Sequence, residues 1–249
     1  MNIKKNDARM LAAACALALI SASGLAAAQD TPDTSSTATV ARKPEETAMK
    51  HVNDAVAVAQ RMLQEPRMKE LLQQAKGVFI VPTYGRAALG VGASGGAGVL
   101  LIKRADGTWS DPAFYNIGGI SAGAQIGAET GAIALVLNNE KAVNKFMQKN
   151  SFSMNAAAGL TIVNWAKIAQ GSLGDGDVVA WAGTKGLYGS LVAVGVSDIR
   201  YNQKLTNAYY HQTVSAADAL AGKHTNPNAD TLKQALATAP VSAPAPVSR

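Results

Sequence analysis

The sequence predicts an α+β fold: one domain with a mostly antiparallel, strongly curved sheet or barrel-like sandwich. Amphipathic helices precede the sheet and short helices follow it. Residues 44–76 repeat apolar side chains at helical spacing, whereas residues 77–196 are rich in glycine and in residues that favour strands. The chain has 249 residues, 48% of them hydrophobic, which is enough to bury one sizeable core.

The first 28 residues have the pattern of a secretory signal peptide. A short basic start precedes an apolar stretch from Met10, and Ala26 and Ala28 are the small residues expected before a cleavage site. We expect cleavage after Ala28 and a periplasmic or secreted protein. Cys15, the only cysteine, could instead carry a lipid, but too few apolar residues precede it for a normal signal core. We favour its loss with the signal.

The charge of the chain limits the classes of partner. The whole sequence has 23 basic and 17 acidic residues (+6), and without residues 1–28 the numbers are 20 and 16 (+4). Such modest basicity is compatible with binding to anionic surfaces. No basic run is long enough to indicate a nucleic-acid partner.

Two helices are predicted before the sheet. Residues 29–44 are rich in Ser and Thr and predict a flexible linker. Pro44 and two glutamates then mark a helix start, and Pro66 ends that helix, so that 67–76 forms a second, shorter one. The face of the first helix that is expected to be apolar consists of Val52, Ala55, Val56, Ala59, Met62 and Leu63.

The sheet and the C-terminal region follow from the same kind of pattern. A helix is expected at 138–150, and short helices at 202–211, 215–222 and 229–237, with a disordered Pro/Ala tail after them. Ser215 and Asp218 have capping-box spacing. We place the domain at 45–222 and a C-terminal helix and tail at 223–249. The candidate strands are 77–82, 87–93, 97–104, 113–118, 120–128, 131–138, 158–164, 177–183 and 187–197.

Two glycine patterns allow other interpretations. Gly90, Gly92 and Gly95 have the G-x-G-x-x-G spacing of a dinucleotide loop, and Asp111 follows at the distance of a ribose-binding acid. That loop needs a helix directly after it, whereas "VLLIKRADG" predicts a strand and a hairpin turn. A nucleotide enzyme is therefore disfavoured.

The second pattern places glycines four residues apart from Gly119 to Gly131. Such spacing is found on the packing faces of membrane helices, but on a strand the same glycines share one face. Gln125 and Glu129 are unfavourable in a bilayer. The strand interpretation is favoured, and it predicts a bare sheet face against which another part packs closely.

No catalytic or metal-binding constellation is found in the sequence. His51, His211 and His224 lack metal-ligand spacing to one another or to carboxylates. "GDGD" at 174–177 lacks the remaining ligands of a calcium loop. We expect no enzyme activity, no cofactor and no metal.

Several stretches together resemble the SYLF domain family. They are "AKGVFIVP" (75–82), "GASGGAGVLLIKRADGTWSDPAFYNIGGISAGAQIGAE" (92–129), "GTKGLYGSLVAVGV" (183–196) and "NAYYH" (207–211), followed by "ADAL" (217–220). The resemblance covers about residues 45–222, and 150–181 match less well. We expect the aromatic residues Trp109, Phe114, Tyr115, Tyr209 and Tyr210 to pack in the core.

The resemblance implies non-catalytic binding of anionic phospholipid head groups, of the phosphoinositide type in eukaryotic members, partly through a basic amphipathic N-terminal helix. The alternative is an envelope structural or protein-interaction module with no lipid role. The apolar helix face could also simply pack on the sheet, with its basic residues solvated. The residues expected to contact lipid are Lys50, Arg61, Arg67 and Lys69, just after Arg42 and Lys43, and Lys103, Arg104 and Lys185 at turns.

Overall fold

A computed structural model describes residues 34–148, 150–154, 160–169, 176–184, 187 and 196–237. The chain divides into two units, Met1–Thr34 and Ser35–Arg249, and only the second is described below. All residues of the hydrophobic core lie in this unit, between Ala48 and Leu236. The predicted signal peptide and the Pro/Ala tail after residue 237 lie outside the described residues.

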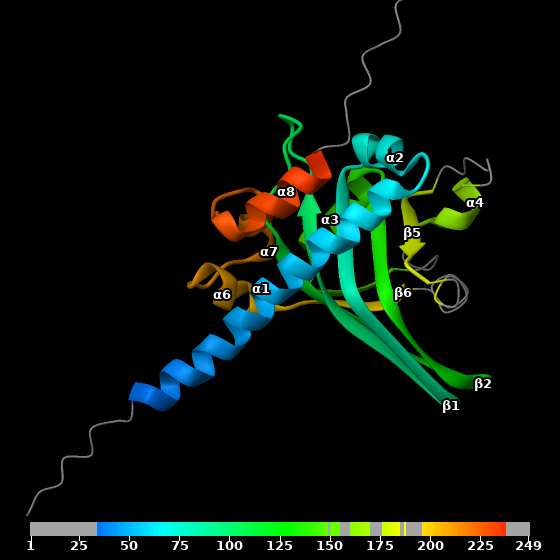
Figure 1. The fold of residues 1–249 in the computed structure, drawn as a ribbon, viewed down its shortest axis with the longest axis horizontal. Helices are drawn as coiled ribbons and strands as arrows, with labels where there is room; N and C mark the ends of the chain where they lie inside the picture. The colour runs from blue at the N-terminus through cyan, green and yellow to red at the C-terminus, as the bar shows by residue number, and fades with distance from the viewer. Residues whose placement is uncertain are drawn as a thin grey trace, which may run out of the picture. The chain divides into compact units, whose positions relative to one another are not determined.

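The order of elements confirms the α+β class. Helix α1 (Thr34–Gln64) and helix α2 (Met68–Gln74) precede the long strands β1 (Gly77–Ile102) and β2 (Ala113–Leu137) (Figure 1). The remaining elements are α3 (Glu140–Gln148), β3 (Ser151–Met154), β4 (Ile162–Asn164), α4 (Trp165–Ala169), β5 (Val178–Ala182), β6 (Val196–Tyr201), α6 (Gln203–Tyr210), α7 (Ala216–Leu220), the 3-10 turn η2 (Pro227–Ala229) and α8 (Asp230–Ala237).

Strand β2 is the centre of the sheet. The strand order is β3-β6-β2-β5-β4, and β1 pairs with β2 in addition. β6 pairs with one end of β2, at residues 115–118, and β5 pairs with the other end, at residues 133–137. Every pairing is antiparallel except that of β4 with β5. The predicted mostly antiparallel, curved sheet is thus confirmed.

The two long strands differ from the prediction of six shorter ones. β1 joins the predicted strands 77–82, 87–93 and 97–104, and β2 joins 113–118, 120–128 and 131–138. The predicted gaps at 83–86, 94–96, 119 and 129–130 lie within the two continuous strands, whose ladder has register shifts between Val81 and Tyr84 and between Leu89 and Val91. Such irregularities bend a strand without ending it.

Both alternative glycine interpretations are overturned. The G-x-G-x-x-G glycines lie inside β1, and no helix follows them. Asp111 is buried, with its carboxylate 3.3 Å from the ammonium of Lys233, and is not placed to bind a ribose. The four-residue glycine pattern lies in β2, as the strand interpretation predicted. Within the described ranges, no helix combines the length and the apolar character needed to cross a bilayer.

The close packing expected of a glycine-lined face occurs mainly in β1. A Cβ atom added to Gly98 would lie 2.2 Å from the carbonyl oxygen of Ile80, and one added to Gly96 would lie 2.6 Å from that of Thr83. Residues 80 and 98 belong to the same strand, and 18 extended residues span about 59 Å. β1 must therefore double back on itself, and its partner strand β2 bends along with it. In β2 the packing along the pattern is uneven: nothing lies within 4 Å of a Cβ added to Gly127, whereas one added to Gly131 would lie 3.0 Å from the side chain of Leu187.

Helix α1 begins earlier than predicted. It starts at Thr34, inside the segment 29–44 that was expected to be a linker, and Pro44 lies within it. Ser and Thr cost only a few tenths of a kcal/mol more than Ala in a helix, so composition alone did not reveal these turns. The helices predicted around α2, α3, α6, α7 and α8 are confirmed, and Ser215 caps α7 through the backbone N–H of Asp218.

The smaller strands were predicted less well. β4 and β5 lie inside the predicted 158–164 and 177–183. Of the strand predicted at 187–197, Leu187 is helical, whereas Val196 and Ser197 are the first residues of β6 (Val196–Tyr201). Residues 188–195 lie outside the described ranges. β3 and α4 were not predicted. β3 has four residues and α4 has five, and both are too short to show a clear periodicity in the sequence.

The C-terminal region belongs to the same compact unit. Leu232 and Leu236 of α8 are buried in the core. The Asp111 carboxylate, in the turn between β1 and β2, accepts a hydrogen bond from the backbone N–H of Asn226 at 3.2 Å and pairs with Lys233. Helix α8, which lies beyond the predicted boundary at residue 222, thus supplies a charge that compensates the buried carboxylate.

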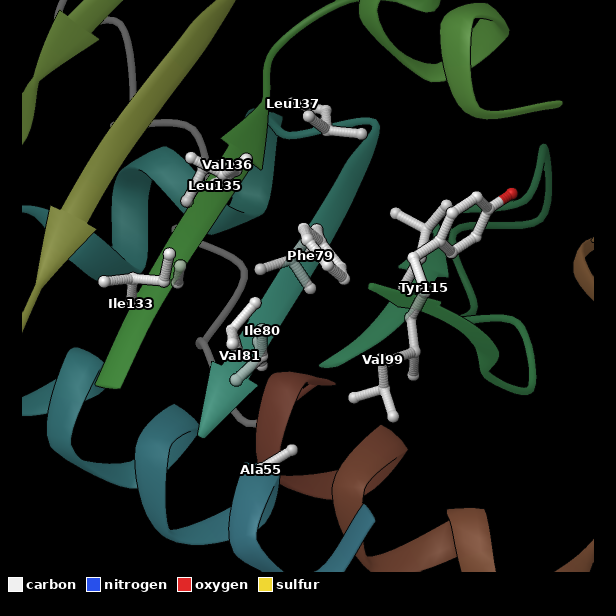
Figure 2. Close-up of a cluster of buried hydrophobic side chains, with 14 of the residues drawn as sticks. Ala55, Phe79, Ile80, Val81, Val99, Tyr115, Ile133, Leu135, Val136 and Leu137 are labelled. Carbon is white, nitrogen blue, oxygen red and sulfur yellow. The ribbon is translucent and has the colours of Figure 1, made fainter. Parts of the chain in front are cut away.

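Aromatic side chains fill the core, as expected. The Tyr115 ring packs edge-on against Phe146, with centroids 5.1 Å apart, and against Phe79 at 6.2 Å. Figure 2 shows Phe79 in the middle of the cluster, with Ile133 and Leu135 on one side and Tyr115 on the other. Phe114 packs against Tyr209, with centroids 5.2 Å apart. Trp109 is 4% exposed, so these rings stabilise the fold rather than a ligand.

Replacing Gly98 by Ala tests the doubling back of β1. The added methyl group would meet the backbone carbonyl of Ile80, and a backbone atom cannot move aside as a side chain can. We expect the free energy of unfolding to fall by about 3 kcal/mol, measured by urea denaturation. Gly85→Ala is the control, because nothing lies within 4 Å of its added Cβ in the same strand. Equal stability of the two variants would contradict the close approach.

Candidate functional site: a basic helix face beside a cleft

Between residues 42 and 64, most of the apolar face of α1 packs on the core, and Val56 and Leu63 are partly buried against it. A helix that enters a lipid interface does so by burying apolar area, and in this conformation most of that area of α1 is already covered by the protein. The six residues of the face that are at most 1% exposed are Ala48, Val52, Ala55, Val58, Ala59 and Met62.

The opposite face of α1 carries a line of basic side chains. Lys43, Lys50 and Arg61 are exposed, and their separations of seven and eleven residues place them on one stripe of the helix. At 1.5 Å per residue the stripe is about 27 Å long. Lys50 forms an exposed ion pair with Asp54 at 2.5 Å, and such pairs are weak enough to open for a ligand.

The other predicted residues near α1 have different surroundings. Arg67 has a left-handed backbone with φ of 66° between α1 and α2, and its guanidinium donates a hydrogen bond to the carbonyl of Ile168 at 3.1 Å. It thus connects this corner to α4. Lys69 is exposed on α2, where a ligand could reach it.

Lys103 and Arg104 have structural partners. The Lys103 ammonium donates hydrogen bonds to the carbonyls of Leu72 and Gln73 at 2.8 Å, at the C-terminal end of α2, and lies 5.0 Å from the centre of the Trp109 ring. Burial, with a smaller contribution from Lys76, lowers the pKa of Lys103. Arg104 lies 3.9 Å from the buried carboxylate of Asp111. Lys185 lies outside the described residues.

A cleft of about 570 Å³ opens where α1, β1 and α6 meet. Lys43 and Lys204 contribute basic side chains to it, and both are exposed. Ala97 of β1 contributes an apolar wall. None of the described residues that line it is acidic. They are Lys43, Pro44, Thr47, His51, Ala97, Asn202, Lys204 and Leu205.

The cleft is not evident from the sequence, in which Lys43 only precedes the basic helix and Lys204 belongs to no predicted site. These two lysines are separated by 161 positions in the chain, and only the pairing of β6 with β2 brings α6 toward β1. A local sequence pattern does not predict that two residues so far apart in the chain lie in the same cleft.

His51 is the titratable group inside the cleft. Burial lowers its pKa below the ordinary 6.5, Asp54 opposes this shift, and Lys50 adds to it. The imidazole is therefore uncharged at neutral pH, and the permanent positive charge of the cleft comes from Lys43 and Lys204. In the described part of the chain, no group of three or more His, Cys, Asp or Glu residues is placed to hold a metal ion.

The fold and the cleft define an α+β binding domain with a basic site. The family model described as "Ysc84: Las17-binding protein actin regulator" matches residues 118–239. The chain belongs to this family, the SYLF domain family that the sequence motifs resembled. The match includes α8 and the residues up to 239, in agreement with the extent of the core.

Curated relatives carry names of the same family. "SH3 domain-containing YSC84-like protein 1" of Bos taurus is 25% identical over 63% of this chain and 46% of the relative. "Protein YSC84" of Saccharomyces cerevisiae is 27% identical over 61% of this chain and 33% of the relative, and "LAS seventeen-binding protein 3" of the same species is 26% identical over 62% and 34%. The chain thus spans less than half the length of these relatives. No solved structure is significantly similar to it.

The lowered pKa of His51 predicts a pH dependence of stability. The folded state disfavours protonation, so below pH 6.5 the unfolded state binds more protons and the free energy of unfolding decreases as the pH falls. We expect His51→Gln to remove this part of the decrease. Urea denaturation of both proteins from pH 7.5 to pH 5 measures it. The same loss of stability in both would show that His51 titrates normally.

Proposed function

We propose that this protein is a non-catalytic module that binds anionic phospholipid head groups at a membrane surface. The observation that supports the proposal is the cleft of α1, β1 and α6, in which Lys43 and Lys204 stand beside apolar surface and no acidic residue lines the described wall. The basic stripe of α1 continues from the same cleft through Lys50 to Arg61. A phosphate group and the beginning of an acyl chain match this combination of charge and apolar surface.

The predicted strength of the interaction is moderate. Each basic residue near an anionic surface contributes about 1 kcal/mol, and exposed charges are screened by salt. Four contributors, Lys43, Lys50, Arg61 and Lys204, would give a reversible association that weakens as the ionic strength rises. The predicted signal peptide places the proposed site of action in the periplasm or outside the cell.

The second candidate is a module that binds a protein partner. The family description names a Las17-binding protein and actin regulation, and one relative is named LAS seventeen-binding protein 3. A partner of that kind would contact a surface of this domain without a lipid. A protein-binding module does not need to bind vesicles, so a vesicle-binding measurement distinguishes the two candidates.

Co-sedimentation of residues 29–249 with liposomes tests the proposed function. We compare neutral vesicles with vesicles that contain phosphatidylglycerol, cardiolipin or a phosphoinositide, at low and at high salt. Lys43→Glu combined with Lys204→Glu removes two attractive charges, at least about 2 kcal/mol, and should weaken binding about 30-fold or more.

The control carries the same charge change elsewhere. Lys145 lies on α3 and Lys167 on α4, and neither lines the cleft. The double variant Lys145→Glu, Lys167→Glu should bind nearly as the unmodified protein does. Equal loss in both double variants would indicate attraction by net charge alone, without a site. No binding to any vesicle would favour the protein-partner candidate.

A further inference from the structure

Three large apolar side chains are exposed in the middle of the long strands. Leu89 is 79% exposed, Val91 66% and Ile120 83%. Figure 1 shows the paired strands β1 and β2 extending past the helices. We call this region, residues 87–93 with 119–128, the ribbon tip.

The register places the three side chains on one face of the ribbon. Residues 89, 91 and 93 alternate with the inward positions of β1, and Ile120 lies directly opposite Ala93. Gly96 and Gly98 belong to the other, inward set, because they are the positions that approach the earlier part of β1. The exposed side chains therefore point to the outside of the doubled ribbon.

The same outer face leads to the cleft. Val99 is fully buried in the core, and two residues before it Ala97 lines the cleft. Gly95, Ala93, Val91 and Leu89 follow at the same spacing, and the last three are exposed. Along the outer face of β1, a residue buried in the core is thus followed by a residue of the proposed head-group site, and then by exposed apolar residues at the ribbon tip. From residue 97 to residue 89 an extended strand spans about 26 Å.

The ribbon tip contains no charged residue. Residues 87–102 and 112–128 contain no Asp, Glu, Lys or Arg. The nearest charges are Arg86 and Glu129, which are directly paired in the register of β1 and β2. A charge-free apolar end bordered by a pair of opposite charges matches a boundary between hydrocarbon and lipid head groups.

A second protein is a poor match for this surface. A specific interface buries about 800 Å² on each partner. An aromatic side chain buries about 150–250 Å², so three smaller aliphatic side chains by themselves do not reach that area. A lipid interface requires no such matching area, because each inserted side chain gains independently from leaving water.

We propose that the ribbon tip inserts its outer face into the bilayer while the cleft holds the head group. This inference rests on the proposed lipid function. The insertion is shallow, because no other described strand pairs with the ribbon at residues 87–93 and 119–128, and hydrocarbon cannot satisfy the free backbone N–H and C=O groups of such edges. Leu89, Val91 and Ile120 lie at the level of the upper acyl chains, and Arg86 remains among the head groups.

An environment-sensitive dye at the ribbon tip tests the insertion. Residues 29–249 contain no cysteine, so Leu89→Cys provides a single thiol for a nitrobenzoxadiazole label. With phosphatidylglycerol vesicles we expect a blue shift, quenching by lipids spin-labelled high on the acyl chain, and little quenching by lipids labelled near the chain end. Thr231→Cys, exposed on α8, is the labelled control and should remain accessible to aqueous iodide.

Charge substitutions test whether insertion contributes to binding. Leu89→Asp combined with Ile120→Asp should weaken binding to these vesicles at least tenfold. Thr231→Asp combined with Asn228→Asp, at exposed positions near α8, carries the same charge change and should weaken it less than threefold. The urea midpoint should be unchanged, because Leu89 and Ile120 make little contact with the core. Equal weakening in both double variants would overturn the inference.

Two readouts separate this inference from the proposed function. Co-sedimentation without a dye response at residue 89 would overturn the insertion and leave head-group binding intact. If the protein does not co-sediment, a C-terminal histidine tag and a nickel-chelating lipid hold it at the vesicle, and the dye still reports whether the tip inserts. A blue shift without vesicles, together with a doubled mass by light scattering, would overturn the inference in favour of a second copy on this face.

Discussion

The close approach of β1 to itself is the constraint on which the rest of the structure depends. The backbone near Gly96 and Gly98 lies so near the carbonyls of Thr83 and Ile80 that no side chain fits between them. This contact folds one long ribbon into two layers. The two ends of β2 are then available to different neighbours, β6 at one end and β5 at the other.

The doubled ribbon also determines which surfaces remain free. Its outer face near Val99 is covered, and most of the apolar side of α1 packs on the core, since Val52, Ala55 and Ala59 are fully buried. A membrane-binding role for α1 then relies mainly on its basic outer side. Most apolar contact with lipid has to come from another part of the molecule, and the middle of the ribbon is where large apolar side chains remain in water.

The sequence was informative where a pattern is long and local. Helical spacing predicted the inner face of α1, the Ser215 cap predicted α7, and the strand character of the glycine-rich centre excluded a nucleotide loop. It was less informative where a residue's role depends on distant partners. Lys103 resembles a surface lysine in the sequence, but it binds the carbonyls at the end of α2, and Lys204 joins Lys43 only because of strand pairing.

Glycine limited the prediction in a different way. A glycine can end a strand, bend it or permit close contact, and the residue type does not distinguish these outcomes. The predicted strands 87–93 and 97–104 leave Gly95 between them, whereas the ladder in fact continues through it. The contact partner of Gly98 is 18 residues earlier in the chain, beyond the range of any turn motif, so the doubling back could not be predicted.

The length of the β1 and β2 ladder has a consequence for how the chain folds. Pairing is most local next to the turn at Asp106 and Gly107, where Leu100 faces Ala113, and least local at the far end, where Gly77 faces Leu137. Closing a loop costs more entropy as it lengthens, so we expect the ladder to grow outward from that turn. β5 and β6 pair with opposite ends of β2 and lie later in the chain. They can join only when the corresponding part of the ladder exists, which gives a topology that folds slowly for its size.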